Sequence, residues 1–99
     1  MNNNYLSLLN FIVEFENIFN ELLLSEKIKK NKNILSEFEK LSKIKYELLI
    51  CLKKGFQKNV NYKKKIILCL NNLLNINLIK SNKNLKRYIM MKLDYISYI

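Results

Sequence analysis

Proline, histidine, tryptophan and alanine are absent from this 99-residue chain, and glycine occurs once, as Gly55. A β-sheet domain of this size needs several tight turns, and proline and glycine are the residues that most often form them. Their scarcity therefore argues against a multi-stranded fold. Ninety-nine residues are enough for one domain with a modest core. The composition predicts a single all-α domain over residues 1–99.

The missing histidine removes the side chain most often used as a general acid or base near neutral pH. Most carboxylates fall on the solvent faces of the predicted helices, and no glycine-rich loop is present to cradle a phosphate. Two cysteines, Cys51 and Cys69, cannot form a zinc site by themselves. We therefore expect neither catalysis nor a bound metal or cofactor.

Long uncharged apolar segments are also missing. The most apolar stretch, residues 6–24, contains Glu14, Glu16 and Glu21, which are too many charges for a membrane-spanning helix. The N-terminal residues lack the basic region of a secretory signal peptide. The sequence therefore predicts a soluble, cytoplasmic protein with no membrane span.

Acidic residues are scarce in the second half of the chain. Residues 1–47 hold seven lysines and seven glutamates, whereas residues 48–99 hold ten lysines and Arg87 against Asp94 alone. The whole net charge of +10 therefore lies in the second half. Such a surface suits an acidic protein, a nucleic acid or an anionic membrane. The alternative is a lysine-biased solvated surface without a function, of the kind that AT-rich coding produces.

Apolar residues recur at three- and four-residue spacing along three segments, which predicts helices over about 5–26, 33–54 and 62–98. Asn33 is expected to cap the second helix, and Gly55 to end it in a left-handed conformation. The first two helices would form an antiparallel hairpin, and the third would complete a three-helix, coiled-coil-like bundle. At 1.5 Å per residue the third helix would be ~55 Å long against ~30 Å for the others. It must then overhang them, or bend at residues 80–84 and fold back.

The C-terminal part of the predicted third helix carries two apolar stripes that lie side by side. We expect the first stripe to pack against the hairpin, and Asn82 on the same line to fix its register. The second stripe has no evident partner within the chain, which favours an intermolecular contact, although a helix sunk deep in its own bundle would also explain it. The first stripe is Leu85, Ile89, Lys92, Ile96 and Ile99, and the second is Tyr88, Met91, Tyr95 and Tyr98.

In residues 42–52, Lys45 is followed by Leu48, Leu49 and Leu52, and in residues 78–99 Asn82 is followed by an apolar helical repeat. These two stretches resemble the second helix and the C-terminal segment of the flagellar export chaperone (FlgN) family, whose members are small, all-helical, cytoplasmic bacterial proteins. Two features depart from the family pattern: Lys83 follows Asn82 where glycine is typical, and the chain stops at Ile99 without a polar tail. The matching residues are Lys45, Leu48, Leu49 and Leu52 in the first stretch, and Asn82, Leu85, Ile89 and Ile96 in the second.

The resemblance implies that the protein binds a partner and catalyses no reaction. Members of the family hold the C-terminal helical segments of the hook–filament junction proteins FlgK and FlgL before export. An amphipathic client helix would lie against the C-terminal helix of this chain, and basic residues at the edge would speed its encounter. The implied partner-binding residues are Asn82, Leu85, Tyr88, Ile89, Met91, Lys92, Tyr95, Ile96 and Tyr98.

Two other readings of the same residues remain open. Lysines interleaved with tyrosines would form a basic stacking surface for nucleic acid, although Arg87 is the only arginine available for bidentate phosphate contacts. Alternatively, the second stripe would pair with its own copy in a homodimer. Peripheral membrane binding by the terminal helix is weaker, because Lys92 and Asp94 interrupt its apolar face.

Overall fold

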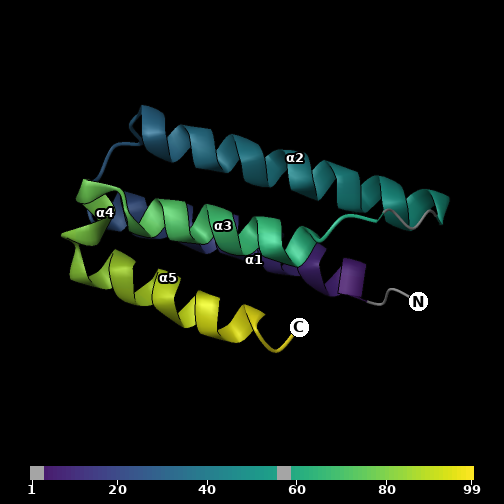
Figure 1. Ribbon diagram of the computed structural model, residues 1–99. Coiled ribbons are helices and arrows are strands. Elements are labelled where there is room, and N and C mark those ends of the chain that lie inside the picture. The colour runs from purple at the N-terminus through teal and green to yellow at the C-terminus, as the bar shows by residue number, and fades with distance from the viewer. Residues whose placement is uncertain (1–3, 56–58) are drawn as a thin grey trace.

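A computed structural model describes residues 4–55 and 59–99 (Figure 1). Residues 1–3 lie outside the described part. They belong to the N-terminal segment for which the sequence predicts no signal peptide. No β-strand occurs within 4–55 or 59–99, so the prediction of an all-helical chain is confirmed. The described residues form α1 (Asn4–Ser25), α2 (Lys32–Lys54), α3 (Tyr62–Leu74), α4 (Asn77–Lys80) and α5 (Lys83–Ile96).

The four longer helices form a bundle in which neighbouring helices run antiparallel (Figure 1). α1 packs against α2 and α5, and α3 packs against the same two helices from the other side. Between α1 and α2, Lys45 Nζ lies 2.6 Å from Glu16 Oε1. The buried faces of all four helices supply one core, because each carries apolar residues at three- and four-residue spacing.

The prediction of one continuous helix over residues 62–98 is wrong, because the chain breaks twice and folds back. The second break lies within residues 80–84, where the sequence analysis allowed for a bend. Asn75 ends α3, with its backbone N–H shared between the carbonyls of Asn71 and Asn72, and Ile76 then turns extended (φ −73°, ψ 129°). A second extended residue, Asn82, precedes α5. The molecule measures 41 Å along its longest axis, too short for a ~55 Å helix. Folding back provides a fourth long helix that buries the first stripe against α1 and α3.

Helix ends follow the expected capping chemistry with one shift. Gly55 ends α2 at φ 69°, as predicted. The N-cap of α2 is Asn31, not Asn33: the Asn31 Oδ1 accepts a hydrogen bond from the Ile34 backbone N–H at 2.8 Å. Asn61 caps α3 in the same way through the Lys64 N–H. Asparagine suits these positions because its short side chain reaches the unpaired N–H groups of the first turn.

None of the helices within residues 4–55 and 59–99 combines the length and the apolar character that a membrane crossing needs.

Candidate partner-binding surface

α5 is held at both ends by side chains from other elements. At its start, Asn82 Oδ1 accepts from the Leu85 backbone N–H at 3.0 Å, while Asn82 Nδ2 donates to Glu26 Oε1 at 3.0 Å. Hydrogen bonds from Asn82 and then Asn84 lower the pKa of the Glu26 carboxyl. At its end, Lys63 Nζ donates to the Ser97 backbone oxygen at 3.2 Å. Asn82 is therefore a helix cap that joins α5 to the end of α1, and it is half-buried rather than a buried register residue.

The first stripe is inside the bundle, as expected. Leu85, Ile89 and Ile96 are fully buried between α5 and its neighbours, and Ile99 is half-buried. In this fold they cannot contact a partner, although the resemblance places three of them in the binding set. They position α5 and leave the contact to other residues.

The second stripe is divided between core and surface. Tyr88 is buried, and its ring stacks on those of Phe15 and Phe19, with ring centroids 5.7 Å and 6.3 Å apart. Tyr95 is half exposed, with its ring 6.2 Å from that of Phe11. Met91, Tyr95 and Tyr98, which are 56%, 54% and 81% exposed, keep the surface position that the stripe predicts.

Phe11 explains the inward part of the second stripe, and sequence reasoning missed it. Phe11, Phe15 and Phe19 are spaced four apart along α1, so they form a continuous aromatic row on one face. The tyrosines of α5 pack on that row once the chain folds back. The spacing could have revealed it, but only together with the break before α5.

Lys92 lies at the edge of this aromatic packing, where its side chain is only 13% exposed. Its ammonium is 5.4 Å from the ring centroid of Tyr95, 5.6 Å from that of Tyr88 and 5.9 Å from that of Phe11. Its Nζ also lies 3.7 Å from Glu14 Oε1 on α1. Lysine can occupy this core-facing position because its stem is apolar and its charge reaches the rings and the carboxylate.

The outward side of α5 combines exposed apolar and basic side chains. Met90, another residue that the sequence analysis missed, is 52% exposed beside Met91. A shallow depression of about 560 Å³ lies on this side. Its lining is formed by Lys83, Lys86, Arg87, Met90, Met91 and Asp94. We call Met90, Met91, Tyr95 and Tyr98, with these flanking basic residues, the α5 surface.

No three His, Cys, Asp or Glu side chains within 4–55 and 59–99 gather as a metal site would require. Cys51 and Cys69 are free and buried. Burial raises the pKa of Cys69 to about 11, which leaves its thiol protonated and weakly nucleophilic at neutral pH.

No family model, curated protein or solved structure matches this chain. The resemblance to flagellar export chaperones therefore depends on the residues quoted above, and the functional argument depends on the α5 surface.

Proposed function

We propose that this protein is a non-catalytic export chaperone that holds an amphipathic helical segment of a client on the α5 surface. The observation that supports this function is that Met90, Met91 and Tyr95 of α5, and Tyr98 in the turn after it, are at least half exposed. The helix has already buried a full stripe, so this second set is surplus to the core. Methionine and tyrosine suit such a contact, because one adapts in shape and the other offers a large ring with a polar tip.

The amount of exposed apolar area limits the affinity. Covering these four side chains would contribute roughly 1–2 kcal/mol each, before the cost of ordering a client. A contact of this size gives a dissociation constant in the micromolar range at best. Lys83, Lys86 and Arg87 would accelerate the encounter with an acidic client more than they would tighten the complex. Micromolar affinity suits a chaperone that must release its client for export.

By resemblance, the clients are the C-terminal segments of the hook–filament junction proteins FlgK and FlgL. Calorimetric titration with these fragments, at low and at moderate salt, tests the proposal. The discriminating variant is Met91→Asp, since Met91 is 56% exposed and a charge there should weaken binding without unfolding the protein. Leu68→Asp on α3, where the native side chain is 60% exposed, is the matched control.

Binding that survives moderate salt, and that Met91→Asp weakens while Leu68→Asp does not, would support the chaperone. A short duplex DNA in the same titration tests the nucleic-acid alternative, for which binding should fall steeply with salt. Sedimentation equilibrium tests self-association, and a dimer that Met91→Asp dissociates would assign the α5 surface to a second copy. Absence of binding to either fragment would contradict the proposal.

A further inference from the structure

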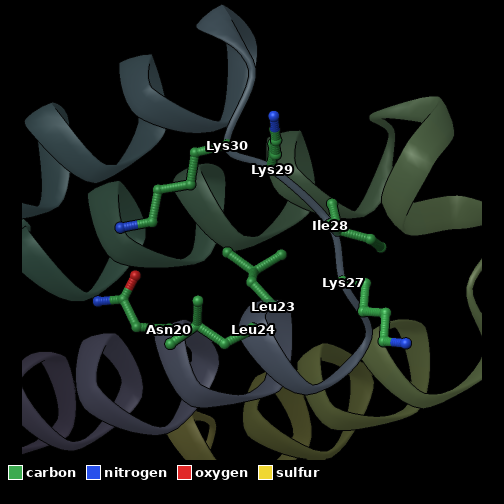
Figure 2. A pocket seen from close by; sticks show the side chains of 7 residues that line it. All are labelled: Asn20, Leu23, Leu24, Lys27, Ile28, Lys29 and Lys30. Carbon is green, nitrogen blue, oxygen red and sulfur yellow. The ribbon is translucent and has the colours of Figure 1, made fainter.

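A groove of about 640 Å³ opens between the last turns of α1 and the chain that leads to α2. Figure 2 shows its apolar side chains, Leu23, Leu24 and Ile28, with lysines projecting around them in different directions. Leu24 is 77% exposed, more than any other leucine that the structure describes. Here an exposed leucine lies among lysines of a connecting segment, whereas the basic residues of the α5 surface come from α5 itself.

The backbone that forms this groove is unusual for a lysine. α1 ends with the Ile28 N–H bonded to the Leu23 carbonyl at 2.9 Å, and with Lys27 in the left-handed conformation at φ 58°. This helix ending normally places glycine at the left-handed position, because side chains other than glycine are strained there. The chain nevertheless places a lysine at this corner, with Lys29 and Lys30 close behind.

More basic residues reach the same end of the bundle from other elements. Lys32 begins α2, Lys80 ends α4 and Lys83 begins α5, and Figure 1 shows these element ends together at one side. The two hydrogen bonds from Asn82 and Asn84 to Glu26 tie the start of α5 to the end of α1. Those bonds also occupy both oxygens of Glu26, the carboxylate next to Lys27.

We propose that this end of the bundle docks onto an anionic lipid bilayer, independently of the α5 surface. Leu24 enters the interfacial region, and the apolar groove beside it receives acyl-chain contacts. Lys27, Lys29 and Lys30 approach the headgroup phosphates, while Lys32 and Lys80 add attraction at longer range. An anionic bilayer complements both features, since it presents negative charge at its surface and apolar chains directly below.

A nucleic acid would complement the lysines of this end but not its apolar groove. A phosphate backbone would use the lysines but would leave Leu24 and the groove exposed to water. An acidic protein helix would need the lysines along one side of a groove. Here they belong to the α1–α2 connection, the start of α2 and the end of α4, at the blunt end of the bundle. A flat, extended anionic surface can contact all of these segments together.

Co-sedimentation with vesicles tests the proposal, using phosphatidylcholine alone and phosphatidylcholine mixed with phosphatidylglycerol. The full chain should sediment with the mixed vesicles and stay in solution with the neutral ones. Replacing Lys29 and Lys30 with glutamate should weaken binding by at least about 10-fold, since each lysine near the surface contributes several-fold. Lys53→Glu with Lys54→Glu, at the opposite end of α2, is the control of equal charge and should weaken it far less.

A second variant, Leu24→Ser, separates insertion from simple charge attraction. It keeps the net charge, and the native side chain is exposed, so the circular dichroism of the protein should not change. Binding to mixed vesicles should fall while binding to duplex DNA stays the same. The proposal would be overturned by equal sedimentation with neutral vesicles, by equal losses in the two lysine variants, by an unchanged Leu24→Ser, or by no sedimentation at all.

Discussion

Two residues within 4–55 and 59–99 adopt a left-handed backbone conformation, and only one of them is the glycine that prefers it. Gly55 adopts φ 69° at the end of α2, and Lys27 adopts φ 58° after α1. A residue with a Cβ is strained in this region by roughly 1–2 kcal/mol. The corner at Lys27 therefore keeps its lysine at a cost in stability.

Substitutions at these two positions should change the free energy of unfolding in opposite directions. Lys27→Gly should raise the free energy of unfolding by about 0.5–1 kcal/mol, since relief of strain outweighs the added freedom of the unfolded chain. Gly55→Ala should lower it by about 1 kcal/mol. A Cβ at Gly55 would meet no heavy atom within 4 Å, so that loss comes from the backbone alone. Urea denaturation measures both, and a destabilised Lys27→Gly would contradict the strain argument.

The two sides of α5 should respond differently to the same substitution. Ile89 is fully buried, so Ile89→Asp places an unpaired charge in the core and should lower stability by roughly 3–5 kcal/mol. Met90 is its neighbour in sequence and is 52% exposed, so Met90→Asp should change stability by less than about 0.5 kcal/mol. Thermal unfolding of the two variants compares them. If both melt alike, α5 does not face the core as described.

Tyr88 combines a buried ring with a hydroxyl that finds no hydrogen-bond partner. Burial, followed by the nearby Glu14, raises the pKa of Tyr88 to about 12, and burial raises that of Cys69 to about 11. Both groups are neutral when protonated, so the folded state binds these protons more tightly than the unfolded chain does. Their contribution to stability is complete below the ordinary pKa values, roughly 8.5 and 10, and is lost as pH rises through the folded values.

Removing the Tyr88 hydroxyl should therefore make the protein less sensitive to alkali. Tyr88→Phe should be neutral or stabilising by up to about 1 kcal/mol near neutral pH, because it eliminates an unpaired buried group. Its advantage over the wild type should grow as pH rises above about 10. Tyr98→Phe, at a position that is 81% exposed, should show no such trend. Urea titrations across this range would detect it, and parallel pH profiles for both variants would refute the expectation.

At the scale of elements, the sequence was sufficient for α1 and α2 and insufficient for the C-terminal half. Strong three–four periodicity and the cation-rich end before Gly55 predict the first two helices to within two residues. The break between α3 and α5 depends on Asn75 and Asn82, which are capping residues but also occur within helices. Only the available packing decides between these roles. A fourth helix buries the first stripe, and a straight third helix would not.

The candidate site was predictable only in part for the same reason. Tyr98 and Met91 lie on the surface as their stripe predicts, whereas Tyr88 belongs to the core because α1 supplies a row of aromatic rings. The apolar periodicity of a single helical segment shows that a second stripe exists. It does not show how much of that stripe a neighbouring helix covers once the chain reverses direction.

The cap at Asn82 should carry much of the stability of the fold-back. Asn82→Ala removes both the hydrogen bond to the Leu85 N–H and the one to Glu26, and should cost about 1–2 kcal/mol. Asn84→Ala removes only a hydrogen bond to Glu26, and should cost less than about 1 kcal/mol. Hydrogen exchange of α5 compares the two variants. Equal protection of α5 in both would mean that the cap does not hold the break.

At the scale of the whole molecule, folding gathers lysines from both halves of the sequence at one end of the bundle. Residues 1–47 carry no net charge, yet they contain Lys27, Lys29, Lys30 and Lys32, and folding brings these four to the end of the bundle where Lys80 lies. The basic end and the α5 surface are therefore distinct regions of one bundle. One offers a leucine among lysines, and the other offers methionines and tyrosines beside basic residues.

The proposed function requires that a client bind at the α5 surface. The most direct test is to titrate ¹⁵N-labelled protein with the C-terminal fragment of FlgK or FlgL and to map the amide shifts by NMR. The account predicts that shifts concentrate at residues 83–98, strongest near Met91 and Tyr98, while residues 27–32 and the core of α3 stay unchanged. Shifts centred on residues 27–32, or none at saturating fragment, would contradict it.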